Sequence, residues 1–590
     1  MLPSPNNFSP HGRFSCSLLT RNVFARVWRW WHVLLLLTAV LWYSTSTFTP
    51  RRFRFRVFKS SRPVDGPRPP PIHLPEGDLW ASRANEVRKA FAHAYRGYQA
   101  HALPYDELLP VSGDRVNNFH GWGVSMYDSL DTMWLMGLED MFYDTVEDVA
   151  GQTFDMAPGE HAHFFEVVIR YLGGLLSAYA LSEDPRLLKL ADVLGEKLLP
   201  AFNTPSGFPL RGVNTRTGET KNGGRNGQEV TCLAEMLSNQ MEFKYLAHLT
   251  GKSKFYAATE QPMKSMYGTE NIMHGGLLAT MWDVTTGKPN QTEFTAAGCA
   301  DSAYEYFLKQ WLMTGQKERK TRDLYIRSAN AIIEQLLYVG PRRQLLYSTD
   351  LIDGAPTHRF QHLTCFLPAL FALGIHTPAL ELSEVERKRH AWAAEGLANM
   401  CWVMYADTTS GLSPDKFVVD QWTVSEHGRW VARVEEWEQA GAPGLPPGVA
   451  DLEREATQKA RGYAATTDAY LLRPEASIYA VETFYIMWRT TKDVKWRERG
   501  WVVFQSLEKN ARARYGYSSV RFLDEPHHKP YQNDDQPSWF LAETLKYLFL
   551  LFTDEELVPL DKWVFNTEAH PLPVFEWNQR EIEEFKIDVS

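Results

Sequence analysis

The chain has 590 residues, of which 44% are hydrophobic and 13% aromatic, which is enough to bury a large core. Its formal net charge of −9 provides no basic face of the kind that binds nucleic acid, so we exclude nucleic acid from its expected partners. Five cysteines in a chain of this length exclude a disulfide-dense scaffold, and their spacing fits no zinc-binding pattern such as CxxC.

The first predicted element is a membrane-spanning helix at residues 30–48, which read WWHVLLLLTAVLWYSTSTF. With its flanks, this apolar stretch reaches about the 20 residues that a bilayer requires. Residues 1–29 contain several arginines and are expected to form a cytoplasmic tail. A cleaved signal peptide is the alternative, but no small-residue cleavage site follows the stretch, which favours an uncleaved signal anchor.

Two opposing signals bear on the orientation of this helix. Six basic residues between Arg51 and Arg62 follow it, and taken alone the positive-inside rule would place the large domain in the cytoplasm. The triplet Asn290-Gln291-Thr292 would make Asn290 an N-glycosylation acceptor if the domain is lumenal. Together with the chemistry described below, this favours a single-pass type II protein of the endoplasmic reticulum or Golgi membrane with a lumenal domain.

Residues 49–78 are rich in arginine and proline and predict a stem, whereas residues 79–590 predict one helical domain. In seven places an apolar helical pattern ends in a short polar turn, and another helix usually follows. These turns begin at Met136, Leu181, Leu249, Met313, Leu373, Thr490 and Phe552. Most lie roughly 40–70 residues apart, enough for two helices and their loops. The pattern predicts helical hairpins that form a closed α/α toroid or an open solenoid.

Several short stretches place carboxylates among apolar residues, where an ionised carboxylate is costly unless it is paired, hydrogen-bonded or bound to a metal. For any single residue a helix cap or a salt bridge is the ordinary interpretation, and Glu166 has Arg170 four residues away. The other polar residues in such stretches are Asp128, Asp131, Asp301, Glu305, Arg473, Glu475, Glu482, Glu543, Thr567, Glu568 and His570. Taken together, they predict an acidic pocket suited to glycoside hydrolysis, to binding a hard cation such as calcium, or to both.

The motifs that carry this pocket resemble those of the class I α-1,2-mannosidases, glycoside hydrolase family 47. The resemblance runs from about Ala81 to Pro573, and its motifs occur in the family's order: DSLDTMWLMGL, FFEVVIRYLGGLLSAY, DSAYEYFLKQ, HLTCFLPALFALG, LLRPE, FLAETLKYLFLLF and FNTEAHPLP. It implies an all-α fold, an (α/α)7 barrel, which here would follow the membrane helix and stem. It also implies an inverting mechanism, one bound Ca²⁺, and removal of α-1,2-linked mannose from high-mannose N-glycans on glycoproteins.

The resemblance also implies roles for individual residues. Glu166 would be the general acid, Glu475 the general base and Asp301 the third catalytic carboxylate. Thr567 would bind calcium through its hydroxyl and main-chain carbonyl. Sugar- or water-binding positions would be His362, Arg473, Trp539, Glu543 and Glu568, and the family's disulfide would join Cys365 to Cys401.

Three departures from the family pattern concern the same site. Ile478 stands where the family usually has a second Glu, and the pattern resumes about four residues late, which indicates an insertion near 477–480. Four residues are close to one helical turn, so Glu482 could return to the same face, or the insertion could disturb Glu475. Trp539 replaces the usual Phe, which keeps an aromatic face for a sugar. Cys299 replaces an Arg or apolar residue and favours the Golgi-type trimming pattern.

We therefore predict an active processing mannosidase with a monomeric lumenal domain. The alternative is a degradation-type homologue that acts mainly as a glycoprotein-recognition factor in endoplasmic-reticulum-associated degradation. A helical scaffold without chemistry is a third interpretation, but it leaves the dispersed carboxylates unexplained.

Overall fold

The structure is a computed structural model that describes residues 78–221, 229–268, 274–472, 479–525 and 528–589. All of these belong to one unit, Gly66–Ser590. The predicted tail, the membrane helix at 30–48 and almost all of the stem lie outside the described residues, as do Arg473 and Glu475. What the sequence indicates for these positions stays a prediction.

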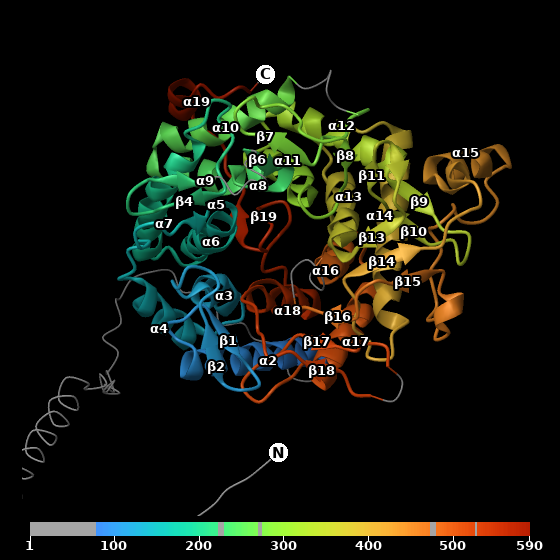
Figure 1. The fold of residues 1–590 in the computed structure, drawn as a ribbon, viewed down its shortest axis with the longest axis horizontal. Helices are drawn as coiled ribbons and strands as arrows, with labels where there is room; N and C mark the ends of the chain where they lie inside the picture. Colours follow the sequence, from blue (N-terminus) through green and yellow to red (C-terminus); the bar gives the residue numbers. More distant parts are fainter. Residues whose placement is uncertain (1–77, 222–228, 269–273, 473–478, 526–527, 590) are drawn as a thin grey trace, which may run out of the picture. The chain divides into compact units, whose positions relative to one another are not determined.

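Seven of the described helices form a closed ring, in which each helix contacts the next and the last returns to the first (Figure 1). They are α3 (Val124–Leu135), α6 (Gly173–Ser182), α9 (Gln240–Thr250), α11 (Asp301–Met313), α13 (Phe366–His376), α16 (Tyr479–Thr491) and α18 (Leu545–Phe552). Each of the seven predicted polar turns begins within three residues of the end of one of these helices.

A second set of helices packs outside the ring, one against each inner helix. In chain order they are α4 (Glu139–Val149), α7 (Pro185–Leu198), α10 (Ser253–Tyr267), α12 (Arg319–Gln335), α14 (Glu384–Ala406) and α17 (Lys495–Asn510). The partner of α18 is α2 (Leu79–His101), the first described helix, so the two ends of the domain close the ring together. The predicted helix-rich domain is confirmed, and the closed contacts match a toroid rather than an open solenoid.

The inner and outer helices differ in sequence because they differ in burial. Every residue of α18, which reads LKYLFLLF, is buried, and so is every residue of α11. The outer helix α7 is amphipathic, since Leu187, Leu190, Ala191, Leu194 and Leu198 form one buried stripe. The polar residues of α11 therefore lie in the interior, where each requires a partner.

Short antiparallel strands lie in the loops between the helices, where the sequence showed few strand patterns. The pairs are β1 (Glu107–Leu109) with β2 (Asp114–Val116), β6 (Val230–Cys232) with β7 (Met281–Asp283), and β9 (Leu337–Val339) with β10 (Leu346–Ser348). The three-stranded groups are β3 (Ala162–His163), β4 (Gly212–Val213) and β5 (Thr220–Lys221); β8 (Glu293–Phe294), β11 (Leu351–Ile352) and β12 (Ala355–Pro356); β13 (Arg359–Gln361), β14 (Lys416–Val419) and β15 (Tyr463–Ala465); and β16 (Ala469–Tyr470), β17 (Val520–Arg521) and β18 (Tyr531–Gln532). Strands of two to four residues are too short to show alternation, which is why the sequence did not predict them.

The last hairpin, β19 (Trp563–Phe565) and β20 (Pro571–Pro573), lies inside the ring (Figure 1). Strand β19 contacts α11, and β20 contacts α6 on the other side. Gly173 permits this approach, because a Cβ there would lie 2.6 Å from Asn566 Nδ2 of the hairpin. Gly174 lets α6 lie close to α3, since a Cβ there would lie 2.6 Å from the Tyr127 carbonyl oxygen. The hairpin tip at residues 566–570 is thus held deep among the inner helices.

Shorter helical segments complete the described chain. They are α5 (Phe164–Glu166), the π-helix η1 (Val167–Leu172), η2 (Leu199–Phe202), α8 (Leu233–Leu237), η4 (His362–Cys365), η5 (Ser425–Gly428), α15 (Trp430–Gln439), η6 (Gln458–Ala460), the π-helix η8 (Phe540–Thr544) and α19 (Gln579–Phe585). The continuous helical stretch Phe164–Ser182 is long and apolar enough to cross a membrane, but it is 72% buried and belongs to the ring. Both π-helices carry charged residues of the candidate site, a common place for π-bulges.

Candidate active site

The hairpin tip is fixed by buried ionic contacts beneath it. Asp131 on α3 accepts hydrogen bonds at 2.8 Å from His570 Nδ1 and at 2.9 Å from Lys546 Nζ, and Lys546 also donates to the Ala569 carbonyl oxygen at 2.6 Å. Burial alone would raise the pKa of Asp131, but Lys546 and His570 hold it below its usual value. Burial also opposes the charge on His570, yet Asp131 raises the pKa of this imidazole. These charges anchor the hairpin to α3 and α18.

Asn566 organises the turn itself. Its side-chain oxygen accepts hydrogen bonds from the backbone nitrogens of Glu568, at 2.9 Å, and His570, at 2.8 Å. Its amide nitrogen donates to the Ile169 carbonyl oxygen at 3.0 Å and to Glu242 Oε1 at 2.8 Å. The backbone of the turn is therefore satisfied internally, and the side chains of residues 567 and 568 are presented to the neighbouring helices.

Arg170, on η1, gathers three carboxylates in the interior. Its Nε donates to Glu166 Oε2 at 2.8 Å, its Nη1 makes a short contact with Glu568 Oε1, and Nη1 also lies 3.6 Å from Asp128 Oδ2. Burial by itself would lower the pKa of Arg170, but Glu568 and Glu166 raise it well above its usual value. Arg170 is thus a permanent positive charge that three acidic groups share.

Two aromatic rings face the same guanidinium. The Trp539 ring centroid lies 5.0 Å and the Phe119 centroid 5.1 Å from Arg170 Cζ, and the two rings meet edge to face with centroids 6.2 Å apart. Trp539 is only partly buried, so part of its indole is available to a ligand. An aromatic face beside hydrogen-bonding carboxylates is an arrangement suited to a sugar ring.

Burial changes the proton affinity of the acidic groups behind Arg170. Desolvation raises the pKa of Glu568 to about 8 even though Arg170 opposes the shift. Desolvation, reinforced by the charge of Glu568, raises the pKa of Glu543 well above its usual value. Glu543 is 1% exposed, and its Oε1 has no hydrogen-bond partner among the described residues. This part of the pocket therefore holds more carboxyl groups than the protein neutralises, which is a mark of functional sites.

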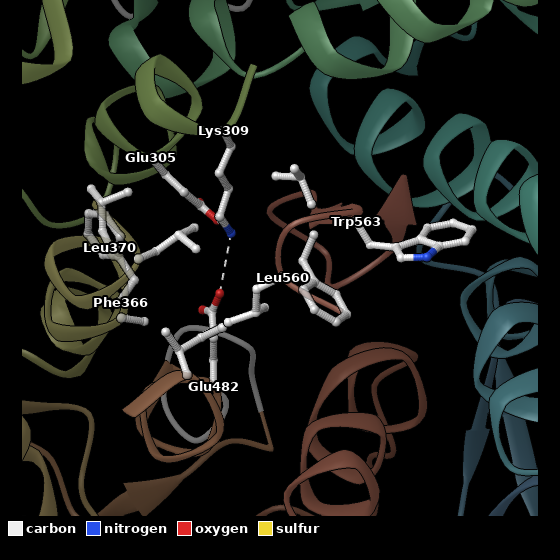
Figure 2. A pocket seen from close by; sticks show the side chains of 12 residues that line it. Glu305, Lys309, Phe366, Leu370, Glu482, Leu560 and Trp563 are labelled. Carbon is white, nitrogen blue, oxygen red and sulfur yellow. Dashed lines mark hydrogen bonds and ion pairs between the residues drawn. The ribbon is translucent and has the colours of Figure 1, made fainter. Parts of the chain in front are cut away.

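A cavity lies on the other side of the hairpin, between α11, α13, α16 and β19 (Figure 2). Its walls are largely apolar, with Phe366, Leu370 and Phe565 among the lining residues, and Figure 2 shows the polar groups Glu305, Lys309 and Glu482 facing one another. These three and the groups nearest to them form a network. Lys309 Nζ makes a short contact with Glu305 and lies 3.3 Å from Glu482 Oε1, which also accepts from the Tyr547 hydroxyl at 3.2 Å.

Thr567 connects this network to the hairpin tip. Its side chain lies in hydrogen-bonding contact with Glu305. Burial raises the pKa of Glu305, and the nearby Glu482 adds to the rise against the lowering effect of Lys309. The predicted calcium ligand thus lies between the Arg170 carboxylates on one side and the Lys309 carboxylates on the other.

The oxygen donors around Thr567 suit a hard cation, but their arrangement limits how many of them could bind it directly. Calcium prefers oxygen ligands, and the pocket offers the Thr567 hydroxyl beside carboxylates that include the unpartnered Glu543 oxygen. Across the described ranges, however, no three His, Cys, Asp or Glu side chains converge as direct metal ligands. A cation at Thr567 would therefore be surrounded by water, with the carboxylates binding those water molecules.

Glu166 lies at the more accessible edge of the Arg170 cluster, with 28% of its side chain exposed. Its backbone nitrogen lies 3.5 Å from His163 Nδ1, the cap of the short helix α5. His163 Nε2 in turn lies 3.4 Å from Glu235 on α8, and Arg211 Nε donates to the same His163 nitrogen at 2.8 Å. The predicted acid is therefore set in a polar rim that Glu235 of α8 and Arg211, the residue before β4, help to build.

The other predicted site residues occupy separate elements. Asp301 is the first residue of α11, is 8% exposed, and accepts a hydrogen bond from the Ser302 backbone nitrogen at 2.9 Å. His362 begins η4 and is fully buried, with its ring 5.5 Å from the Tyr405 ring. Asn290, the predicted glycosylation acceptor, is exposed, as a glycan attachment site must be.

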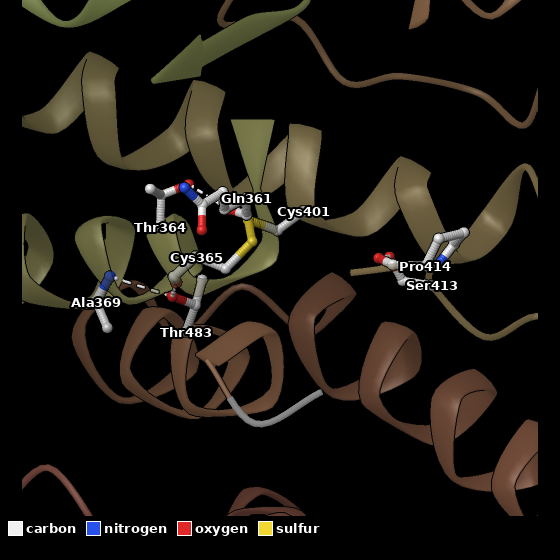
Figure 3. The surroundings of a disulfide bond; sticks show 8 residues. All are labelled: Gln361, Thr364, Cys365, Ala369, Cys401, Ser413, Pro414 and Thr483. Atoms are coloured by element: carbon white, nitrogen blue, oxygen red, sulfur yellow. Dashed lines mark hydrogen bonds between the residues drawn. A yellow bond between two sulfur atoms is a disulfide. The ribbon is translucent and has the colours of Figure 1, made fainter. Parts of the chain in front are cut away.

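A disulfide joins Cys365, at the end of η4, to Cys401 on α14, as the family resemblance implied (Figure 3). The Thr483 hydroxyl donates to the Cys365 carbonyl oxygen and accepts from the Ala369 backbone nitrogen at 3.2 Å. Because Thr483 follows Glu482 directly, this contact fixes the position of Glu482 on α16. Tyr479 and Ala480, part of the predicted insertion, are the first residues of that helix.

Sequence reasoning missed several residues that complete the site. Glu107 and Glu242 are both buried, and desolvation raises each pKa to about 7. Glu107 accepts hydrogen bonds from Ser538 and Asn118, and Glu242 accepts from the Tyr306 hydroxyl at 2.7 Å. Two of the missed residues left a signal in the sequence, because a charge amid helical apolar residues must be paired. They are Glu242 in the stretch MEFKYLAHL and Lys546, the partner of Asp131, in LKYLFLLF.

Comparison with known proteins gives concordant results over most of the chain. The family model described as Glycosyl hydrolase family 47 matches residues 90–574. The endoplasmic reticulum mannosyl-oligosaccharide 1,2-alpha-mannosidase of Rattus norvegicus is 36% identical over 498 residues, which are 84% of this chain and 68% of that protein. The mannosyl-oligosaccharide 1,2-alpha-mannosidase IC of Homo sapiens is 34% identical over 532 residues, 89% of this chain and 76% of that protein. The solved α-1,2-mannosidase from Trichoderma reesei superposes with a TM-score of 0.70 at 27% identity, covering 84% of this chain and 99% of that one.

Proposed function

The chain belongs to glycosyl hydrolase family 47, and we propose that it removes α-1,2-linked mannose from high-mannose N-glycans of glycoproteins. The observation that carries the proposal is the buried Arg170 cluster, in which Glu166, Glu568 and Asp128 meet beside the partly exposed Trp539. A structural salt bridge needs one acid for each base, whereas this cluster and its neighbour Glu543 hold an excess of acids.

The reaction follows from two carboxyl groups on opposite sides of a sugar. A protonated acid delivers its proton to the leaving oxygen while a carboxylate base takes a proton from water. We assign the first task to Glu166, because it is the accessible member of the cluster. We assign the second to Glu475, by its place in the family's motif. Direct attack by water makes the enzyme inverting.

We propose that calcium is the cofactor and that Thr567 is its direct protein ligand. Support comes from the oxygen donors around Thr567 and from burial, which raises the pKa of Glu305 although Lys309 opposes the shift, and raises that of Glu543 although Arg170 opposes it. When bound, calcium would hold sugar hydroxyls and water by their oxygen atoms. Trp539 would pack on the ring face, and Arg170 would keep the surrounding carboxylates in place.

The proposed location is the membrane of the endoplasmic reticulum or the Golgi apparatus, with the N-terminal helix as a type II anchor. The apolar stretch at 30–48 and the exposed sequon at Asn290 support this arrangement. One of the similar proteins is an endoplasmic reticulum mannosidase, which agrees with a location in the early secretory pathway.

A single assay tests the activity. The full-length chain, purified in mild detergent, is given a nine-mannose N-glycan with and without EDTA, and free mannose is measured. We expect release that EDTA abolishes and added calcium restores. Glu166→Gln should lower the rate by about 10²–10⁴-fold, the usual contribution of a general acid.

Glu498→Gln is the matched control, because Glu498 also pairs with an arginine, Arg83, but does so at the surface and outside the pocket. It should leave the rate unchanged. Glycan binding without any mannose release at high enzyme concentration would refute the hydrolase and support the recognition-factor alternative.

A further inference from the structure

Two cysteines of the described chain remain as thiols, and they lie together. Cys232 ends β6 and is buried, whereas Cys299 lies in the exposed part of the loop before α11. Although 67 positions separate them in the sequence, their side chains are in hydrogen-bonding contact. The other two described cysteines form the Cys365–Cys401 disulfide. The proposed lumenal location is an oxidising environment, in which two thiols in contact can also form a disulfide.

The backbone around both thiols is held in place. The Ala234 backbone nitrogen donates to the Cys299 carbonyl oxygen at 2.9 Å, and the Leu233 nitrogen donates to the Thr280 carbonyl oxygen at 2.9 Å. In the loop, Ala297 and Ala300 are fully buried. Because a direct hydrogen bond joins the two segments next to the thiols, a bond between the sulfurs needs only side-chain rotation and small backbone shifts.

The pair lies between two carboxylates of the candidate site. Cys299 is two residues before Asp301, which begins α11. Cys232 caps α8, and Glu235 in the first turn of that helix contacts His163, the residue that caps the helix carrying Glu166. A covalent link here would join the segment that positions Asp301 to the rim that surrounds Glu166.

We propose that Cys232 and Cys299 form a reversible second disulfide that fixes the Asp301 loop to α8 at the rim of the active site. A disulfide compound such as glutathione disulfide is the oxidant. The Cys299 thiolate attacks one sulfur of that compound, its S–S bond breaks, and one glutathione thiolate leaves and takes up a proton. The Cys232 thiolate then attacks the Cys299 sulfur and releases the second glutathione. Two protein thiols lose two protons and two electrons, and one glutathione disulfide gains them as two thiols.

The order of attack follows from the environments of the two sulfurs. Cys299 is exposed and can meet the oxidant, whereas Cys232 is 6% exposed. The hydrogen bond with Cys299 and burial raise the pKa of the Cys232 thiol well above its usual value, which protects it from direct oxidation by solutes. Once Cys299 carries glutathione, Cys232 is the adjacent nucleophile.

The test counts thiols. The full-length protein is equilibrated with glutathione disulfide or with reduced glutathione, denatured in the presence of iodoacetamide, and mapped by mass spectrometry without reduction. We expect a cross-linked peptide containing Cys232 and Cys299 after oxidation, and two alkylated residues at these positions after mild reduction, with Cys365–Cys401 intact in both. Alkylation of both residues after oxidation, or glutathione retained on Cys299 beside an alkylated Cys232, would overturn the proposal.

Variants supply a readout that a purely structural role for either side chain would not produce. Oxidation should raise the Tm of the wild-type chain by several degrees and should have no effect on Cys232→Ser, Cys299→Ser or the double variant. Each variant should have the same Tm in the oxidised and in the reduced buffer, because each lacks one of the two sulfurs that the bond requires. Cys16→Ser is the control and should retain the full redox response. A redox response of the Tm that is retained in either single variant would contradict the proposal.

The expected effect of the disulfide on turnover rests on the proposed function. The formation of the disulfide itself does not depend on that function. We expect the oxidised enzyme to release mannose with a higher kcat than the reduced enzyme, by about twofold to tenfold, because Asp301 is held in place. A cross-link with no mannose release in either state would refute the mannosidase, whereas mannose release with no cross-link would refute the disulfide.

Discussion

Replacing Arg170 by methionine should destabilise the protein severely, because it leaves several buried carboxylates without their shared cation. Arg170 is 4% exposed, Glu568 is 1% exposed and Asp128 is fully buried, so water cannot replace the lost charge. Removing one partner of a buried ion pair typically costs about 3–5 kcal/mol. We expect a loss of this size in the free energy of unfolding of Arg170→Met at pH 7.

The loss should also depend on pH in a definite direction. Burial raises the pKa of Glu568 to about 8 in the folded wild type, although Arg170 lowers it. Without Arg170 the pKa rises further, so the folded variant must keep Glu568 protonated at a pH where the wild type does not. The destabilisation should therefore grow above pH 8, by up to about 1.4 kcal/mol per pH unit.

The measurement is urea unfolding at several pH values, followed by tryptophan fluorescence and near-ultraviolet circular dichroism, since coincident curves test whether the transition is two-state. Arg580→Met is the control, because Arg580 and Glu584 form an exposed pair worth about 0–1 kcal/mol. Glu568→Gln should reduce the damage done by Arg170→Met when the two are combined. A loss below about 1 kcal/mol for Arg170→Met, with no growth above pH 8, would show that Arg170 does not neutralise this cluster.

Three further predictions concern the buried carboxyl of Glu568, the metal and the base. Glu568→Gln should flatten the pH dependence of the free energy of unfolding. A carboxyl whose folded pKa is about 8 contributes stability that is complete below its unfolded pKa and is lost as the pH rises to about 8. The same pH profile in the variant and the wild type from pH 5 to 8 would contradict this. Thr567→Ala should weaken calcium binding at least tenfold by calorimetry and reduce the rise in Tm that calcium produces, whereas Thr250→Ala, at the end of α9, should not. Glu475→Gln should lower kcat by about 10²–10⁴-fold while leaving glycan binding intact, and normal turnover in Glu475→Gln with none in Glu482→Gln would move the base to Glu482.

The ring of hairpins was predictable because each hairpin left a local signal. Seven polar turns separate apolar helices, and each turn begins within three residues of the end of one inner helix. Closure was not predictable from these signals, since it depends on the contact between α2 and α18, which are separated by more than 400 residues. The short loop strands escaped prediction because two to four residues cannot show a period.

The candidate site was predictable only in part, for a related reason. Glu166, Glu543 and Glu568 stood out because each lies in an apolar or recognisable motif. Asn566, which fixes the hairpin turn, and Glu107, which accepts from the Ser538 backbone, are ordinary residues in their local sequence. Their importance comes from partners elsewhere in the chain, which only the folded ring brings together.

The contacts of Glu482 limit how the chain can accommodate the predicted insertion after Glu475. Three contacts hold Glu482 and its neighbour: Lys309 at 3.3 Å, the Tyr547 hydroxyl at 3.2 Å, and the bond from Thr483 to the Cys365 carbonyl oxygen. The helix from this point onward is therefore set by the ring, and four extra residues cannot be absorbed by sliding α16. Tyr479 and Ala480, the last two residues of the predicted insertion, already belong to this helix. Deleting residues 477–480 would remove the first two residues of α16, including the fully buried Ala480, so we expect a fall in Tm as well as in kcat, and an unchanged Tm would show that this end of the helix adds nothing to the packing.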